Sequence, residues 1–291
     1  MRIGVHLISF DFAGGAPTVA PTLAALGAAV EEAGVDNLSL MDHYLQLRMI
    51  GPPELPMLEG YTTLGFLAAH TSTVDLQLLV TGVTYRHPGL LAKIVTTLDV
   101  LSGGRAVLGL GAAWNEEEHR ALGVEFPPVA ERFERLEETL QVVRQMFGPD
   151  TGPYAGRHYR LDATINSPAP LRTPRIMVGG AGERKTLRLV AKYADACNIF
   201  ANPDGGPTAV QHKLDVLRDH CEREGTDYDA IAKTILWSAR LDPLRGREFV
   251  EQMREFAAIG VSEVHVMHFG NEPVGFVEEL GRSVVPALHD L

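Results

Sequence analysis

The chain of 291 residues contains little cysteine and no long apolar run. Its two cysteines, Cys197 and Cys221, form no CxxC pair and no zinc-finger spacing, so they support neither a disulfide framework nor a structural zinc site. No uninterrupted apolar stretch reaches the roughly 18 residues that a membrane helix needs. Residues 1–10, MRIGVHLISF, resemble a strand more than a signal peptide. We therefore expect a cytoplasmic protein that does not bind a membrane.

The sequence also lacks an excess of positive charge. It has 26 Lys and Arg against 37 Asp and Glu, a formal net charge of −11, and its basic residues are scattered. A nucleic-acid binder would gather them into a stripe, so nucleic acid is not expected as a partner. Because 45% of the residues are hydrophobic and 22% charged, the chain can bury a sizeable core.

Short strand-like runs alternate with segments of helical periodicity along the whole chain. The eight predicted strands are 2–9, 37–41, 76–81, 106–111, 175–179, 196–200, 234–239 and 263–269. The predicted helices are 21–33, 61–70, 90–101, 132–147, 186–193, 208–224, 248–259 and 274–288.

Eight alternating β and α units predict a single (β/α)8 TIM-barrel domain over residues 1–291. A doubly wound open sheet is the competing fold, but its glycine fingerprint is absent after the first strand, where the chain reads ISFDFAGGAP. Two segments depart from the regular spacing and are interpreted as insertion loops, 46–60 and 148–173. The first follows a strand, so we expect it to overhang the mouth of the barrel.

Asp42 and His43 end the second predicted strand and place a carboxylate and an imidazole at the mouth. The alternative is that Asp42 binds a local backbone donor and that His43 only packs in the loop. Gly82, in the segment after the third strand, suits either a close approach to a flat ligand or an ordinary strand end.

The segment GGRAVLGLGAAWNEEEH, 103–119, does not match the motifs that it partly resembles. As a GxGxxG fingerprint it fails because its last position is Trp114. It also lacks HExxH, so the acidic run from Glu116 to His119 is interpreted as a solvated first helical turn, and no metal site is expected.

The segment IMVGGAGERKTL, 176–187, is a strand, a glycine turn and a helix with two early cations. Converging backbone N–H groups, the helix N-terminus, and Arg184 or Lys185 would suit a phosphate. Such turns also join strands to helices without binding anything. Two other histidines, His265 and His268, are three residues apart on a predicted strand and so make a poor metal pair, although we expect His268 to reach the mouth.

The rim pair at 42–43, the stretch 83–119 and VGGAGERKTLRLVAKYADACN at 178–198 together resemble the bacterial luciferase-like superfamily. The resemblance covers nearly the whole chain and is greatest to the F420-dependent oxidoreductase branch. It implies a TIM barrel, a homodimer and the deazaflavin coenzyme F420, with FMN as the alternative. It also implies a non-prolyl cis peptide at Leu79–Val80, facing the cofactor ring.

The same resemblance assigns site residues. Near the ring or the ribityl chain it places Asp42, Leu79, Val80, Thr81, Ala112 and Asn115; around the phosphate it places Gly179, Gly180, Gly182 and Glu183. His43 would donate or remove the proton that accompanies hydride transfer. Trp114 and His6 would line the substrate pocket, although a lone barrel histidine such as His6 is more often a packed residue.

The function expected from this resemblance is hydride transfer between the deazaflavin and a small organic substrate. Trp114 and the lack of a basic cluster for a substrate phosphate favour reduction of an unsaturated compound over oxidation of a sugar phosphate. Two alternatives remain open, an FMN-dependent monooxygenase and a barrel that binds a flavin without catalysis.

Overall fold

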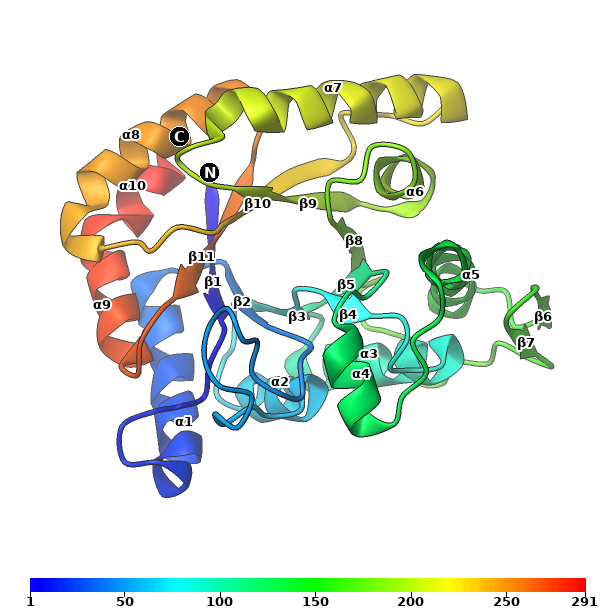
Figure 1. The fold of residues 1–291 in the computed structure, drawn as a ribbon, viewed down its shortest axis with the longest axis horizontal. Helices are drawn as coiled ribbons and strands as arrows, with labels where there is room; N and C mark the ends of the chain where they lie inside the picture. Colours follow the sequence, from blue (N-terminus) through cyan, green and yellow to red (C-terminus); the bar gives the residue numbers. More distant parts are fainter.

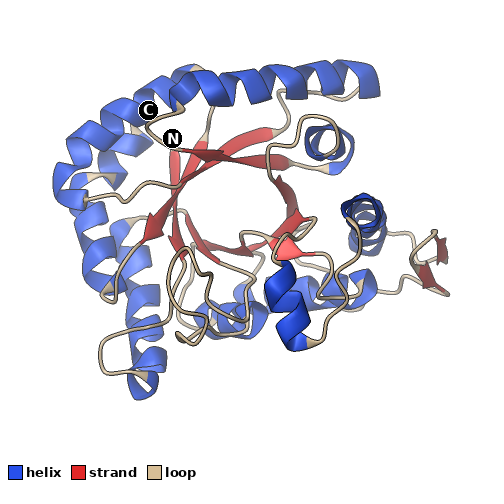
Figure 2. Ribbon diagram, viewed as in Figure 1, coloured by secondary structure: helices blue, strands red, loops and turns tan.

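The computed structural model describes residues 1–291 and forms a closed parallel barrel inside a ring of helices (Figures 1 and 2). Each strand pairs with its neighbours in chain order, and the pairing of the first strand with the last closes the ring. The eight strands of the barrel are β1 (Arg2–Leu7), β2 (Asn37–Leu40), β3 (Asp75–Leu78), β5 (Ala106–Gly111), β8 (Arg175–Gly179), β9 (Ala196–Ala201), β10 (Ala232–Trp237) and β11 (Glu263–His268). The predicted TIM barrel and its eight strands are confirmed.

The predicted helices are also present, within a few residues of the expected ends. They are α1 (Ala16–Ala33), α2 (Gly60–Ala68), α3 (Pro88–Ser102), α5 (Val129–Phe147), α6 (Thr186–Tyr193), α7 (Gly206–Glu224), α8 (Gly246–Ala258), α9 (Pro273–Ser283) and α10 (Val285–His289), with a 3-10 turn at Pro243–Arg245. The pair α9 and α10 replaces the single predicted helix 274–288. None of the helices combines the length and apolarity that a bilayer crossing needs.

Three local features add to the regular pattern. The predicted strand 76–81 is interrupted after β3 by a cis peptide between Leu79 and Val80, and the short β4 (Thr81–Gly82) resumes pairing with β5. A complete helix, α4 (Glu116–Leu122), follows β5. Within the predicted insertion 148–173, β6 (Tyr154–Ala155) and β7 (Arg160–Leu161) form a hairpin, which projects beyond α5 (Figure 1).

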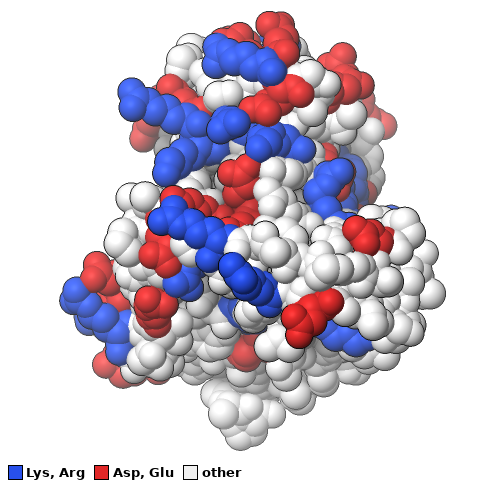
Figure 3. Space-filling view, turned by 90° about the vertical axis from the view of Figure 1, so that its right-hand side faces the viewer, with Lys and Arg blue, Asp and Glu red and all other residues white.

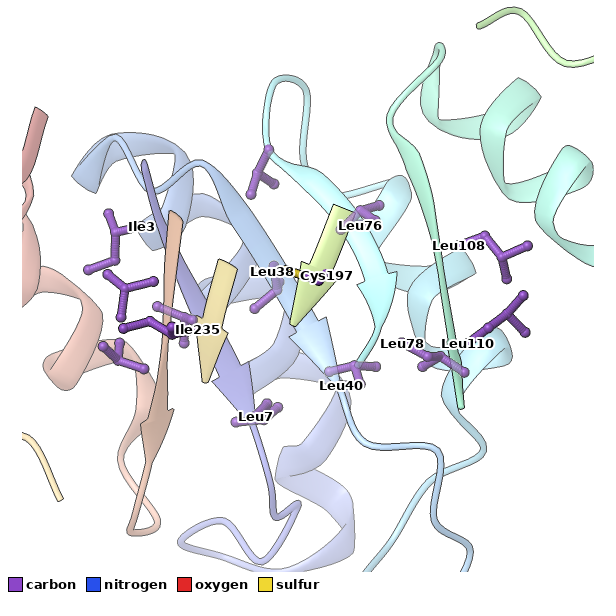
Figure 4. Close-up of a cluster of buried hydrophobic side chains, with 14 of the residues drawn as sticks. Ile3, Leu7, Leu38, Leu40, Leu76, Leu78, Leu108, Leu110, Cys197 and Ile235 are labelled. Carbon is purple, nitrogen blue, oxygen red and sulfur yellow. The ribbon is translucent and has the colours of Figure 1, made fainter. Parts of the chain in front are cut away.

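The strands are buried on both faces, which explains their nearly continuous apolar sequences. Leucines such as Leu38, Leu76 and Leu108 point outward and pack in one cluster with apolar residues of the helices (Figure 4). The inward face is more polar: the side-chain amide of Gln77 donates to Asn37 Oδ1 at 3.2 Å. The helices are therefore held by the outer face, and the inner face is left for a site.

Charged residues close the N-terminal end of the barrel. The Glu263 carboxylate is only 1% exposed and lies 3.0 Å from Arg175 Nη2 and 3.6 Å from Arg2 Nη1. Burial opposes its ionisation, but His265, Arg175 and Arg2 hold the pKa of Glu263 well below its usual range. The opposite end, where the strands terminate, forms the mouth.

The first predicted insertion, 46–60, packs over one side of this mouth. The side-chain amide of Gln46 donates to the carbonyl of Ile8 at 3.0 Å, and Leu47 packs with Ile8 and Met41. Met267 and Phe269 contact the same small cluster. The loop therefore covers the ends of β1, β2 and β11 with apolar side chains.

Gly109 in β5 has no side chain, so the segment after β3 can pack directly against the β5 backbone. A Cβ at Gly109 would lie 2.3 Å from the carbonyl oxygen of Leu78 and 3.0 Å from Val80 Cγ1. Gly109→Ala should lower the free energy of unfolding by about 3 kcal/mol or more, measured by urea denaturation. The matched control is Gly65→Ala in α2, where a Cβ has no neighbour within 4 Å and helix propensity predicts a gain of up to about 1 kcal/mol. Equal stability of the two variants would contradict this packing.

Candidate active site

Polar side chains from several post-strand segments meet at the mouth of the barrel. His43 follows β2, Tyr85 follows β4, and Glu118 lies in α4 after β5. In this fold the carboxyl ends of the strands carry the chemistry. The arrangement therefore places residues that are far apart in sequence around one opening.

The Glu118 carboxylate is the centre of this arrangement and is 1% exposed. Its Oε1 accepts from the backbone N–H groups of Tyr44 and Leu45, at 2.6 and 2.9 Å. Its Oε2 contacts His43 Nδ1 at 2.8 Å and accepts from the Tyr85 hydroxyl at 2.5 Å. Four donors thus surround one buried carboxylate.

These contacts fix the charge of Glu118 and the tautomer of His43. Burial would raise the pKa of Glu118, but hydrogen bonds from His43, Tyr85 and the Leu45 N–H outweigh burial and lower the pKa to about 2. An ionised carboxylate only accepts, so His43 Nδ1 must carry the hydrogen. His43 Nε2 is then the nitrogen left for a ligand, beside the Trp114 ring, whose centroid is 5.7 Å from the imidazole.

The interpretation of the acidic run as a solvated helical turn is wrong for Glu118. Glu116 and Glu117 are exposed as expected, whereas Glu118 points back into the mouth. Asn115 begins α4 and its side chain accepts from the Glu118 N–H at 3.3 Å, so the third residue of the helix faces β2 and β4. The spacing Asn115-x-x-Glu118 is that of a capping box, but the Glu118 side chain binds across the mouth and not the Asn115 N–H, so the sequence carried no signal that separates Glu118 from its neighbours.

Asp42 does not contact His43 but pairs with an arginine. Its carboxylate accepts two hydrogen bonds from the Arg86 guanidinium, at 2.8 and 3.0 Å, and one from the Gly82 N–H at 2.9 Å. Arg86 also donates to Glu59 Oε1 at 2.6 Å and lies over the Tyr61 ring, 4.9 Å from its centroid. Sequence reasoning missed Arg86 because 44 residues separate it from Asp42.

The residues expected beside a cofactor ring lie around the segment after β3. The expected cis peptide at Leu79–Val80 is confirmed. The Val80 side chain packs directly against the backbone of Gly111 and Gly179. A Cβ added at Gly111 would lie 2.8 Å from this side chain, and one added at Gly179 would lie 2.9 Å from it. Thr81 is buried and its hydroxyl contacts Tyr61 Oη at 2.7 Å. This side of the mouth is therefore built from glycine backbone and a single small apolar side chain.

The end of β5 supplies the adjoining wall. Ala112 is half-buried there, and Ala113 adopts the left-handed conformation with φ 58°. The Ala113 carbonyl accepts from Arg132 Nη1 at 3.0 Å, which holds the turn. Asn115, expected near the cofactor, uses its side-chain oxygen as the cap of α4. Trp114 is 57% exposed at the rim.

The glycine turn after β8 presents unpaired backbone donors. Gly180 has φ 113°, a conformation that favours glycine, and its N–H donates to the Asn198 carbonyl at 3.0 Å. The N–H groups of 181–184 donate to no protein acceptor. The Glu183 carboxylate turns away to Lys213 Nζ and His212 Nε2, at 2.5 and 3.0 Å. Glu183 therefore contributes its backbone N–H to the turn, as residues 181, 182 and 184 do, and its side chain takes no part.

The remaining histidines have distinct surroundings. His6 is 2% exposed, and its Nδ1 contacts Ser39 Oγ at 2.9 Å. Burial, with His265 and His43 nearby, lowers the pKa of His6 to about 3, so it is neutral. The expectation that His268 reaches the mouth is wrong, because its ring packs against Phe276 of α9 at 5.1 Å. No group of three His, Cys, Asp or Glu is arranged to hold a metal ion.

Surface charges are mixed on the side of the molecule that carries α5 and α6. Lys and Arg side chains lie beside Asp and Glu across this face (Figure 3). One such pair joins Lys192 of α6 to Glu137 of α5 at 2.6 Å. The cations of this face are thus partly balanced by neighbouring acids.

The model of one protein family, luciferase-like monooxygenase, matches residues 1–263. The chain belongs to this family. The protein is 30% identical to an F420-dependent glucose-6-phosphate dehydrogenase of Nakamurella multipartita, over 87% of this chain and 74% of that protein. It is 29% identical to the pyrimidine monooxygenase RutA of Stutzerimonas stutzeri, over 58% of this chain and 47% of that protein.

Solved structures agree on the fold. An F420-dependent secondary alcohol dehydrogenase, in complex with an F420–acetone adduct, superposes with a TM-score of 0.81 at 16% identity and covers 99% of this chain and 98% of its own. A long-chain alkane monooxygenase superposes with a TM-score of 0.81 at 12% identity, over 100% of this chain and 91% of its own. At these identities the likeness shows the barrel and not the reaction.

The buried Glu118 generates a pH-dependent stability prediction. Because its folded pKa of about 2 lies below the ordinary value of 4.5, its ionisation stabilises the fold above pH 4.5, and this contribution is lost as the pH falls toward 2. Glu118→Gln should therefore unfold more easily than the parent at pH 7, by on the order of 3 kcal/mol, with a smaller difference at pH 3. Urea denaturation at both pH values measures it.

The control for this experiment is Glu117→Gln. Glu117 is exposed and pairs with Arg48 on the surface, where such pairs contribute little. Its urea midpoint should match that of the parent at both pH values. A Glu118→Gln difference that stays constant from pH 7 to pH 3 would show that Glu118 does not ionise as described.

Proposed function

We propose that this protein is an F420-dependent oxidoreductase that transfers hydride between the deazaflavin and a small organic substrate. The observation that carries the proposal is the His43–Glu118 pair, which points an imidazole nitrogen into a mouth that also contains a phosphate-type turn. Support comes from F420-dependent relatives at about 30% identity over most of the chain. The match covers 74% of the length of the Nakamurella multipartita relative but only 60% of the length of the Microbacterium testaceum relative. We therefore do not assign the substrate of these relatives to this protein.

The residues present fit a coenzyme with a flat ring and a phosphate. The unpaired N–H groups of 181–184 could all donate to phosphate oxygens, and Arg184, which has no acidic partner, adds a positive charge. The Val80 segment, seated on the glycines of β5 and β8, gives the ring a smooth surface. We propose Gly179, Gly180, Gly182 and the Glu183 backbone for the phosphate, and Asp42, Leu79, Val80, Thr81, Ala112 and Asn115 for the ring side.

When bound, the deazaflavin supplies the carbon that carries the hydride. The protein's own contribution is to handle the accompanying proton at His43 Nε2. Glu118 holds Nδ1–H, which keeps the ring oriented and stabilises the imidazolium that forms when Nε2 takes up a proton. Burial and the hydrogen bond to Glu118 raise the pKa of Tyr85, so Tyr85 remains a donor to that carboxylate.

Asp42 has an indirect role in this scheme. Bound to Arg86 and the Gly82 N–H, it fixes the segment after β3 against β2. Trp114 and the apolar loop 46–60 limit the access of water to the mouth, and His6 lies deeper as a neutral lining residue. Trp114 at the rim and the lack of a basic cluster for a substrate phosphate support our proposal that the reaction is reduction of an unsaturated compound such as an enone or imine. We also propose a homodimer, as in the family.

FMN is the second candidate cofactor, because pyrimidine monooxygenases are among the similar proteins. The glycine turn suits the phosphate of either coenzyme. Purified protein should be titrated with F420 and with FMN separately, following quenching of cofactor fluorescence. We expect F420 to bind at least tenfold more tightly than FMN, and tight binding of FMN alone would refute the proposed cofactor.

Replacing the imidazole tests the proton step. His43→Ala should lower turnover by about 10²-fold or more, with F420 affinity nearly unchanged, because the residue acts on the proton. Turnover is followed by F420H2 oxidation with a panel of enones, imines and ketones. His70→Ala, at an exposed histidine beyond the far end of α2, should match the parent. Undiminished turnover of His43→Ala would remove His43 from the mechanism, and a cofactor that never changes redox state would favour a non-catalytic binding protein.

A further inference from the structure

The mouth has two chemically different halves. The half formed by β4, β5 and β8 presents glycines and Val80. The half formed by β9, β10, β11, β1 and β2 presents larger side chains from alternate positions of each strand, which all point to the barrel axis. On this half the axis-facing residues nearest the mouth are Phe200, Leu236, Met267, Phe269, Ile8 and Met41.

Arg240 lies in the loop that follows β10, three residues beyond its last residue, Trp237. Within β10, Thr234 contacts Asn198 inside the barrel and Leu236 packs with interior residues, and the loop leaves the strand at the mouth. The Arg240 guanidinium carbon lies 5.5 Å from the centroid of the Phe269 ring, which itself packs on the cluster beneath loop 46–60. The cation is therefore attached to the apolar half of the mouth.

Arg240 has no acidic partner. It is exposed and makes no ion pair or hydrogen bond with the rest of the chain. Several other arginines on the segments after strands are neutralised: Arg48 by Glu117, Arg86 by Asp42 and Glu59, Arg120 by Glu116, and Arg245 by Glu248. Arg184, which adjoins the glycine turn, also lacks an acidic partner, as do Arg132 in α5 and Arg247 in α8. In a chain of net charge −11, a free guanidinium at this place is available to an anionic ligand.

We propose that Arg240 binds a carboxylate of the substrate, and that the substrate is an unsaturated compound with an apolar body and one carboxylate. This inference rests on the proposed function, because it assigns the substrate half of the same mouth. Phe200, which is 65% exposed, and Phe269 provide flat apolar contacts for the body. A planar guanidinium matches a carboxylate with two parallel hydrogen bonds.

A phosphate dianion fits this half less well. Arg240 supplies one positive charge there, and the nearest ring, Phe269, is apolar. A single carboxylate balances a single guanidinium without further cations.

The test compares trans-cinnamate with cinnamamide, which share an apolar unsaturated body and differ in charge. Binding is measured by calorimetry at low salt, with and without F420. The parent should bind cinnamate about tenfold or more tightly than cinnamamide, and the preference should decrease at high salt. Arg240→Gln should abolish the preference, and Arg240→Lys should retain part of it. Arg245→Gln, which removes an exposed paired arginine nearby, should keep the full preference.

Equal or undetectable binding of the two compounds by the parent would overturn the proposal, as would an Arg240→Gln variant that still prefers cinnamate. Folding of each variant is checked by its urea midpoint. Failure of the proposed function looks different: the cinnamate preference would persist and depend on Arg240, while F420 would neither bind nor change redox state. The two ideas can therefore fail separately.

Discussion

A single buried carboxylate organises the mouth of this barrel. Glu118 accepts hydrogen bonds from two backbone N–H groups of the segment after β2, from His43 and from Tyr85. Three segments that are far apart in sequence are thereby held against each other. A neutral carboxyl at position 118 would keep only one good acceptor oxygen and would carry a hydrogen of its own, so it could not satisfy all four buried donors, which is costly. The orientation of His43 and the path of the segment after β2 both depend on this charge.

The rest of the mouth is arranged around the buried Glu118. A second ion pair, Arg86 with Asp42, fixes the segment after β3 in the same way and leaves both charges satisfied. Glycines of β5 and β8 then form one side, and the aromatic and aliphatic residues of β9 to β2 form the other. His43 lies at the boundary, which is where a proton must be handled if a hydride donor and an acceptor occupy the two sides.

Much of the fold could be predicted from the sequence because it depends on local periodicity. The runs 106–111 and 175–179 coincide with β5 and β8, since buried parallel strands are nearly continuous apolar segments. The cis peptide at Leu79–Val80 came from the family resemblance and not from any local rule. The break between α9 and α10 was missed because the apolar pattern continues through it, although Pro286 in the first turn of α10 marks the break.

The site was harder to predict for a different physical reason. His43 and the glycine turn stand next to strand ends, where a one-dimensional pattern can find them. The partners that define their chemistry, Glu118 and Arg86, come from other βα units, and their pairing depends on how the barrel closes. Three consecutive glutamates look alike in sequence, yet only Glu118 is buried, because the start of α4 at Asn115 sets which residue faces the mouth.

The proposed proton step depends most directly on the tautomer of His43. With the imidazoles labelled with ¹⁵N, NMR of the protein near pH 8 reports which ring nitrogen carries the hydrogen. Hydrogen at Nδ1 and a bare Nε2, with the signals assigned by comparison with a variant lacking His43, is the result expected for an imidazole bound to ionised Glu118. Hydrogen at Nε2 with a bare Nδ1 would contradict the proposed geometry.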